Sequence, residues 1–253
     1  MMKRNPDIRI KTPEELILLR EAGSILAQIF VSLKSSVKAG KSTAEIDLLV
    51  EELIKRNDVL PAFKGYRGFP NCSCISVNEQ VVHGIPGKHL LKDGDIVSVD
   101  IGIVYKGFYS DMAVTFGVGV LDSSAQKLLD VTKQALLKGI AEAFPGNYLG
   151  DISSAIQKYV ESRSFSIVRD FVGHGIGRQL HEDPEIPNYG SPKTGPLLRS
   201  GMVFAIEPMV NMGKPGTKTL KDGWTVVTVD AKPSAHFEHT VAITDSGPVI
   251  LTD

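Results

Sequence analysis

The feature that most restricts how this chain can fold is a pair of aspartates inside its most apolar strands. Asp100 lies in IVSVDIGIV and Asp111 lies in YSDMAVTF, two β-branched runs joined by a turn near residues 105–107. A turn at Tyr105–Lys106 would place the aspartates directly opposite each other, and a turn one residue later would make them diagonal neighbours. In either register the two side chains share one face and approach within roughly 5–8 Å.

Such a pair of carboxylates needs a compensating charge wherever that face is buried. Burying an unpaired carboxylate costs several kcal/mol unless it is protonated or finds a cation. Lys106 lies at the bend, too far along the hairpin to neutralise the aspartates. The pattern therefore favours a cation from outside the hairpin. The alternative, that both aspartates face water on an open sheet, stays open at this point.

Two glutamates repeat this pattern later in the chain. Glu207 ends the apolar run GMVFAI, and Glu238 alternates with Phe237 and His239 in AHFEHTVAI. Each could be an exposed charge at a strand end, but four acids in apolar strands together predict a metal site. Carboxylates combined with imidazole suit manganese, iron, cobalt or zinc. Carboxylates can also bridge, so four of them favour two ions over one.

The histidines come from a glycine-rich stretch, FVGHGIGRQLHEDP, at residues 171–184. Its glycines allow the backbone to turn sharply and to approach another group closely. We expect His174 to supply the imidazole ligand that the acids lack, and His181 to lie beside the metals as a hydrogen-bond donor. The alternative is a glycine-rich surface loop with incidental histidines.

The order of predicted elements indicates an internal duplication. Capping boxes begin two helices, with Thr12 before Glu15 and Ser42 before Glu45. Strands follow, and then helices and strands again. The second helix matches a later helix at constant offset, through the pairs Glu45 and Asp151, Ile46 and Ile152, Val50 and Ile156, and Ile54 and Val160. This predicts one α+β domain over residues 1–253, with halves of about 12–120 and 121–253 and a cleft between them.

Composition excludes several classes of protein. The 253 residues are 42% hydrophobic, enough for a core without disulfides, and the net charge of -1 shows no footprint for nucleic acid or anionic membrane. Cys72 and Cys74 fit neither a zinc knuckle nor a disulfide framework, which favours a reducing cytoplasm. The N-terminal MMKRNPDIRI lacks the apolar segment of a secretory signal. No apolar run approaches the ~18–20 residues that a membrane span requires.

Taken together, the motifs resemble those of type I methionine aminopeptidases. VVHGIP, SVDIG with Asp111 eleven residues after Asp100, GHGIG followed by LHEDP, FAIEPM and HFEHT occur in that family's order and spacing, from about Thr12 to Leu251. The resemblance implies the pita-bread fold, with two pseudo-symmetric halves, an antiparallel sheet and outer helices. It also implies removal of the initiator methionine from nascent polypeptides whose second residue is small. We further expect a cytoplasmic monomer that associates transiently with ribosomes.

The same resemblance implies roles for individual residues. Asp111 and Glu238 would bridge two divalent ions (cobalt, manganese, iron or zinc), with Asp100 completing one site and His174 with Glu207 the other. Glu207 would also move protons, and His83 and His181 would bind the scissile peptide. A monovalent cation, sodium or potassium, would be bound near Asn78, Gln80 and Ser234. The walls of the methionine pocket would be Tyr66, Phe69, Cys74 and Trp224, with Phe63 and Leu180 nearby, and the alternative for each aromatic residue is plain core packing. Phe63 departs from the family, in which bacterial members commonly have a small residue there.

Related and unrelated alternatives remain. Prolidases and creatinases share the fold but carry an additional N-terminal domain, and we expect none before the first helix. Type II methionine aminopeptidases have a helical insertion, which is not expected between Glu207 and Glu238. A metal-free binding protein on the same fold and a plain α+β protein with scattered acids are the non-enzymatic alternatives.

Overall fold

The structure is a computed structural model that describes residues 7–253. The prediction that the chain begins without a secretory signal falls mainly on residues 1–6, which lie outside the described residues. The predicted helices are all present, together with two short 3-10 helices. Their bounds are α1 (Pro13–Leu33), η1 (Lys34–Ser36), α2 (Thr43–Arg56), η2 (Tyr66–Gly68), α3 (Ser123–Ile140) and α4 (Leu149–Glu161).

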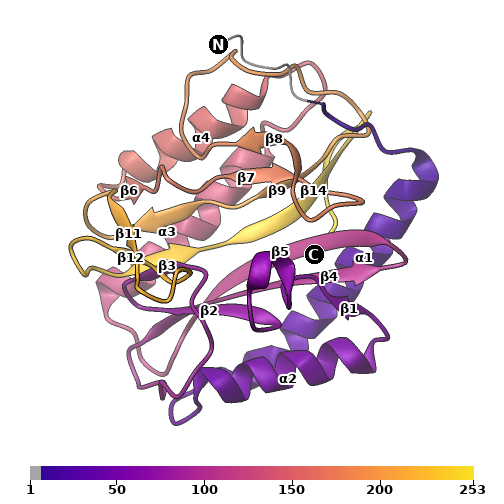
Figure 1. Ribbon diagram of the computed structural model, residues 1–253. Coiled ribbons are helices and arrows are strands. Elements are labelled where there is room, and N and C mark those ends of the chain that lie inside the picture. Colours follow the sequence, from indigo (N-terminus) through magenta and orange to yellow (C-terminus); the bar gives the residue numbers. More distant parts are fainter. Residues whose placement is uncertain (1–6) are drawn as a thin grey trace.

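A nine-stranded antiparallel sheet forms the centre of the molecule (Figure 1). Its strands run in the order β1, β4, β5, β14, β9, β7 and β8, with β2 beside β4 and β15 beside β14. The bounds are β1 (Leu60–Pro61), β2 (Ser73–Val77), β4 (Ile96–Tyr105), β5 (Phe108–Gly117), β7 (Gly173–Gly175), β8 (Glu182–Ile186), β9 (Val203–Ile206), β14 (Glu238–Thr244) and β15 (Gly247–Ile250).

Two three-stranded sheets complete the fold. One has the order β13, β10, β6 and the other the order β11, β12, β3. Their bounds are β3 (Gln80–Val82), β6 (Ser166–Ile167), β10 (Met209–Asn211), β11 (Thr217–Thr219), β12 (Val226–Thr228) and β13 (Ser234–His236).

The four helices lie along the central sheet in two pairs, α1 with α2 and α3 with α4 (Figure 1). The first pair packs on the outer side chains of β4, including Val97, Val99 and Ile101. The second pair packs on residues of β9 and β14, including Phe204 and Val241. The opposite face of the same strands is therefore left free to form the site.

The duplication predicted from sequence is repeated in local structure. The backbone N–H of Ser42 donates to Glu45 Oε2 over 2.8 Å at the start of α2. The backbone N–H of Tyr148 donates to Asp151 Oδ2 over 2.7 Å at the start of α4. Each bond satisfies an N–H group that the helix itself leaves unpaired.

The mixed α+β class and the antiparallel sheet are as expected.

The hairpin of β4 and β5 has the later of the two predicted registers. Tyr105 pairs with Phe108, so the turn is formed by Lys106 and Gly107. Both have positive φ values, 47° and 82°, which a two-residue hairpin turn requires and glycine adopts without strain. Asp111 is consequently opposite Gly102, and Asp100 is opposite Ala113, so the aspartates are diagonal neighbours on one face.

The stretch CISVNEQVVHGI (residues 74–85) has the sequence pattern of a short hairpin with a polar bend, but its two arms do not form a ladder with each other. One backbone bond joins them, from the N–H of Ile75 to the oxygen of Gly84 over 2.8 Å. The two strands and the polar bend exist, but β2 pairs with β4 whereas β3 pairs with β12. Asn78 separates them. Its side-chain amide donates to Asp95, its side-chain oxygen accepts the N–H of Ile96, and its backbone has a positive φ of 53°. These bonds hold Asn78 at the bend between β2, in the central sheet, and β3, in a three-stranded sheet.

Helix α1 with the following turn, Pro13–Ser36, is long and apolar enough to cross a membrane by length and composition. Arg20 and Glu21 interrupt it, which is why no unbroken apolar run marks it in the sequence. Its contacts are mainly with β4 and β5. The core therefore accounts for its apolar face, formed by Leu19, Ala22, Leu26, Ile29, Phe30 and Leu33.

Two substitutions in α1 test this packing. Leu26 is fully buried, whereas Val31 is 77% exposed. We expect Leu26→Ala to lower the free energy of unfolding by about 2–5 kcal/mol, because it removes buried methyl groups and leaves a cavity. Val31→Ala should change it by less than about 0.5 kcal/mol. Urea denaturation of both variants measures this, and equal losses would show that the helix packs through a different face.

Candidate metal centre and adjoining cavity

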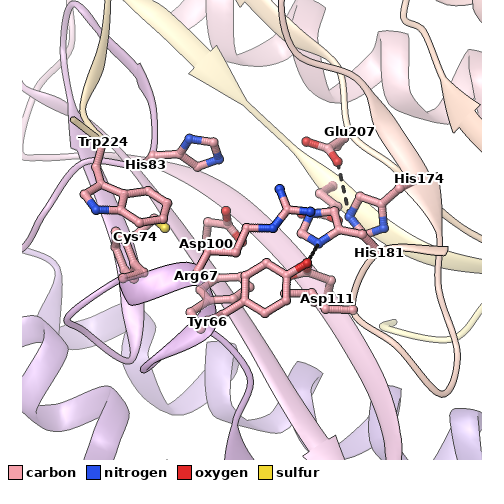
Figure 2. A pocket seen from close by; sticks show the side chains of 14 residues that line it. Tyr66, Arg67, Cys74, His83, Asp100, Asp111, His174, His181, Glu207 and Trp224 are labelled. Atoms are coloured by element: carbon pink, nitrogen blue, oxygen red, sulfur yellow. Dashed lines mark hydrogen bonds and ion pairs between the residues drawn. The ribbon is translucent and has the colours of Figure 1, made fainter. Parts of the chain in front are cut away.

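All thirteen residues predicted to form the site line one cavity of about 150 Å³ (Figure 2). The cavity lies on the face of the central sheet that the helices leave free. Its polar end consists of His83, Asp100, Asp111, His174, His181, Glu207 and Glu238. Its apolar end consists of Phe63, Tyr66, Phe69, Cys74, Leu180 and Trp224.

The acids converge because neighbouring strands place them on one face. Ala113 of β5 is paired with both Asp100 of β4 and Glu238 of β14, so these three residues form a row across three strands. Asp111 lies two residues from Ala113 and faces the same side. Side chains two apart along a strand share a face, so the register of β4, β5 and β14 is sufficient to gather three carboxylates.

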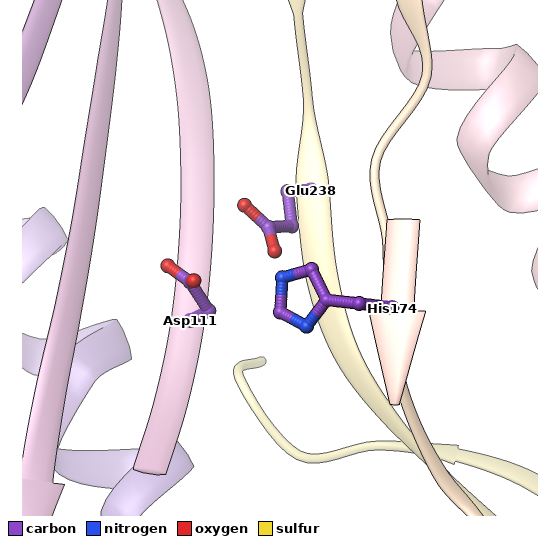
Figure 3. A group of neighbouring side chains, drawn as sticks. All are labelled: Asp111, His174 and Glu238. Carbon is purple, nitrogen blue, oxygen red and sulfur yellow. The ribbon is translucent and has the colours of Figure 1, made fainter. Parts of the chain in front are cut away.

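His174 on β7 brings an imidazole to this row. Candidate ligand atoms of Asp111, His174 and Glu238 all lie within 4.8 Å of one another, and Figure 3 shows the three side chains directed toward a common point. Glu207 follows β9, the strand between β7 and β14. Its Oε1 lies 3.6 Å from His174 Nε2. The five residues predicted as ligands therefore come from adjacent strands.

The carboxylates are poorly compensated by the protein itself. Burial raises the pKa of Asp111 to about 7. Burial and the negative charge of Asp111 raise the pKa values of Asp100, Glu207 and Glu238. Asp100 Oδ1 and Glu238 Oε1 are buried and have no hydrogen-bond partner among residues 7–253. Oxygen atoms left unpaired in this way fit a hard or borderline divalent cation.

His174 has the tautomer that a metal ligand needs. Its Nδ1 lies 2.9 Å from the backbone oxygen of Gly175, which can only accept, so Nδ1 carries the proton. The lone pair is then on Nε2, the nitrogen that faces Glu207. Burial lowers the pKa of His174 to about 4, so the ring is neutral near pH 7. A hydrogen bond from the other ring nitrogen commonly orients a histidine ligand in this manner.

His181 and His83 lie at the rim of the polar end. The ring of His181 is 4.2 Å from the ring of His174, centroid to centroid. Its Nδ1 is 2.8 Å from the hydroxyl oxygen of Tyr66. The ring of His83 contacts Phe171 and Trp224 edge to face. Burial lowers the pKa of His83, so this imidazole is also neutral near pH 7.

The apolar end of the cavity is built from aromatic rings and a thiol. The rings of Phe69 and Trp224 meet edge to face at 5.2 Å. Phe63 fits because Gly102 of β4 faces it, and a Cβ at that glycine would lie 2.6 Å from the ring. Burial, followed by the charge of Asp100, raises the pKa of Cys74, so its sulfur remains a neutral thiol. The predicted pocket residues thus enclose space as well as adding to the core.

Two residues at the site were missed in the sequence. His236 is buried, and its Nε2 lies 3.6 Å from Glu207 Oε2 without a hydrogen-bond partner among the described residues. Its spacing of two from Glu238 is a strand signal that could have identified it. Arg67 lines the cavity mouth from a left-handed backbone with φ of 50°. No periodicity marks that position.

The three residues predicted to bind a monovalent cation, Asn78, Gln80 and Ser234, lie near one another in the structure. Asn78 and Ser234 lie side by side, and the backbone N–H of Ser234 donates to the backbone oxygen of Asn78 over 2.9 Å. Gln80 begins β3 close to them. Binding of sodium or potassium at this point stays a prediction.

Comparison with known proteins agrees with the geometry. The profile of metallopeptidase family M24 matches residues 17–245. A methionine aminopeptidase of Clostridium perfringens is 56% identical over 97% of this chain and 98% of its own. This chain belongs to metallopeptidase family M24. The crystal structure of a methionine aminopeptidase from Thermotoga maritima superposes with a TM-score of 0.96 at 51% identity, covering 97% of this chain and 99% of that one.

These relatives confirm the resemblance to type I methionine aminopeptidases and the pita-bread fold. A prolidase from Pyrococcus furiosus shares the fold, with a TM-score of 0.79 at 24% identity, but this M24 chain covers only 65% of the prolidase. Between Glu207 and Glu238, a segment that the structure describes completely, there are strands and turns and no helix. The helical insertion expected of type II enzymes is therefore absent from that segment. Membership of a metallopeptidase family also implies a divalent metal cofactor.

The raised pKa values predict how the metal-free protein responds to pH. The folded chain binds more protons at the acids than the unfolded chain does, so its stability falls as pH rises from about 4 toward 7. Asp111→Asn should therefore stabilise the metal-free protein near pH 8, by about 1–3 kcal/mol, and less near pH 5. Urea denaturation with EDTA measures this. Asp245→Asn, at an exposed position, is the control, and a destabilised Asp111→Asn would contradict the electrostatic reasoning.

Proposed function

We propose that this chain is a methionine aminopeptidase, which hydrolyses the first peptide bond of nascent polypeptides whose second residue is small. The observation that carries the proposal is the junction of two unlike surfaces in one cavity. Four carboxylates and an imidazole lie at one end, and an apolar pocket of aromatic rings and a thiol lies at the other. Relatives of that name at high identity over the full chain length support it.

The five proposed ligands suit a pair of divalent ions. Asp111 and Glu238 occupy the middle of the group and would bridge, Asp100 would complete the site on one side, and His174 with Glu207 the site on the other. Bound there, a metal pair lowers the pKa of a water molecule and polarises the substrate carbonyl. Cobalt, manganese, iron and zinc are all compatible with this set of oxygen and nitrogen ligands.

The remaining chemistry belongs to side chains of the chain itself. Glu207 would accept a proton from the attacking water and deliver it to the leaving amine. His83 and His181 would donate hydrogen bonds to the scissile peptide and stabilise the tetrahedral oxyanion. Neutral imidazoles can do this because each keeps one N–H.

The apolar end accounts for the choice of methionine. Phe69, Trp224 and Cys74 surround a space suited to a thioether, which is polarisable and makes favourable contacts with rings. A smaller cavity of about 120 Å³ adjoins the polar end, between Phe171, Met209 and His236. We assign it to the second residue of the substrate, and its size would exclude bulky side chains.

We further propose that residues 1–253 form a single catalytic domain that works as a cytoplasmic monomer. Its substrates would be nascent chains, and transient association with ribosomes would bring it to them. A monovalent cation near Asn78, Gln80 and Ser234 would order the loop between β2 and β3.

A peptide assay tests the assignment. The protein loaded with manganese or cobalt should release methionine from Met-Ala-Ser, because alanine fits the second cavity, and should release little from Met-Leu-Ser. EDTA should abolish the reaction. Methionine release is measured by chromatography. A metal-binding protein that hydrolyses neither peptide would instead support the non-enzymatic alternative on the same fold.

Glu207→Gln tests proton transfer. The amide keeps the size of the side chain but cannot accept the proton of the attacking water. We expect kcat to fall by about 100-fold or more, since general acid–base catalysis contributes about 10²–10⁴-fold. Circular dichroism and metal titration check the fold and the occupancy. Near-normal kcat at full metal occupancy would rule out this role for Glu207.

A further inference from the structure

A hydrogen bond crosses the cavity between residues that are distant in the chain. The hydroxyl oxygen of Tyr66 lies 2.8 Å from Nδ1 of His181, 115 positions later. The two rings stack at 5.2 Å with an angle of 26° between their planes (Figure 2). Tyr66 comes from the predicted N-terminal half and His181 from the C-terminal half. The contact therefore joins the two sides of the cleft at the point where a substrate would lie.

The backbone holds Tyr66 firmly in this place. It begins the short helix η2, which follows Gly65 and ends at Gly68, and these two glycines have φ values of 87° and 91°. The backbone N–H of Tyr66 donates to Phe63, and its backbone oxygen accepts from Phe69, both over 2.9 Å. The loop is therefore hydrogen-bonded on both sides of Tyr66, which fixes the backbone from which this side chain extends toward His181.

The chemistry of the two groups indicates the direction of the bond. A phenol O–H is a good donor, while its oxygen is a weak acceptor because the lone pair is delocalised into the ring. An unprotonated imidazole nitrogen is a good acceptor. With Tyr66 donating, Nδ1 of His181 carries no proton and Nε2 carries it.

The neighbouring imidazole is set the other way. Nδ1 of His174 donates to the oxygen of Gly175, so its Nε2 has a lone pair. The two rings are 4.2 Å apart, yet one is bonded to a pure acceptor and the other to a hydroxyl. The Gly175 oxygen thus leaves His174 with a lone pair on Nε2, and a donating Tyr66 hydroxyl would leave His181 with an N–H at Nε2.

We propose that Tyr66 is a positioning residue whose hydroxyl sets His181 in the form with the proton on Nε2, directed into the cavity. This deepens the proposed function, on which its catalytic consequence rests. Nε2–H of His181 would be ready to donate to the substrate carbonyl without a change of tautomer. Tyr66 would then have two roles, forming the wall of the methionine pocket and orienting the group that acts on the bond.

The tautomer can be measured directly, without turnover. Metal-free protein labelled with ¹⁵N at histidine is studied at neutral pH by long-range ¹H–¹⁵N correlation, which distinguishes the two nitrogens of each ring. The signals of His181 are assigned from their loss in His181→Ala. We expect His181 of the unaltered chain to be predominantly protonated on Nε2 and to become a mixture in Tyr66→Phe. Protonation on Nδ1, or a pattern that Tyr66→Phe leaves unchanged, would overturn the proposal.

Kinetics provide the second readout. Tyr66→Phe keeps the ring that lines the pocket, so KM for Met-Ala-Ser should change by less than about twofold, whereas kcat should fall about tenfold, the size expected for one lost hydrogen bond. Tyr109→Phe is the matched control. Tyr109 borders the same apolar cluster, and its hydroxyl has no hydrogen bond to another residue between 7 and 253. It should leave both constants unchanged.

The two readouts separate this inference from the proposed function. If the unaltered protein shows the expected tautomer but no metal supports hydrolysis of Met-Ala-Ser, the positioning role stands and the assigned reaction fails. If the protein is active but Tyr66→Phe lowers neither the Nε2–H population nor kcat, the reaction stands and the role of Tyr66 is refuted.

Discussion

The structure depends on the confinement of four carboxylates on one face of the central sheet. Without a cation these groups repel one another and lose hydration, and burial holds their pKa values above the ordinary range. A folded chain accepts this cost only where other interactions exceed it. Here two helix pairs pack on the reverse face of the same strands and supply that stability. Successive side chains of β4 point to opposite faces of the sheet, so Val99 and Ile101 face the helices and Asp100 faces the cavity.

The histidines around the carboxylates differ in the hydrogen-bond partners of their ring nitrogens, and these partners set which nitrogen carries the proton. His174, His181 and His236 lie within a small volume around Glu207, and each has a different local environment. A backbone oxygen contacts one, a hydroxyl contacts the second, and the third has a buried Nε2 without a partner among the described residues. Lone pairs and N–H groups are thereby distributed before a substrate arrives. Such preorganisation is a large part of how active sites stabilise charge that develops during reaction.

Much of the candidate site could be predicted because its residues stand out locally. Asp100 and Asp111 are acids among β-branched residues, and the turn glycine Gly107 selects the register that makes them diagonal neighbours. The starts of α1 and α2 could also be predicted, because the capping boxes at Thr12 and Ser42 act over only a few residues. His236 and Arg67 were missed for different reasons. His236 reaches the site through its partner strand β10, and Arg67 through a left-handed turn that no periodic pattern marks.

The sequence by itself determined the four α-helices, the hairpin of β4 and β5 and the chemical types that would meet, because helical capping, strand alternation and turn geometry act over a few residues. It did not determine β7 and β8, which come from the glycine-rich stretch. Only the tertiary structure decided which elements became neighbours. It separated β2 and β3 into different sheets and brought Tyr66 to His181 across 115 positions. Those arrangements depend on how the two helix-covered parts of the sheet pack together. Contacts between residues so far apart in the sequence leave no periodic pattern from which they could be predicted.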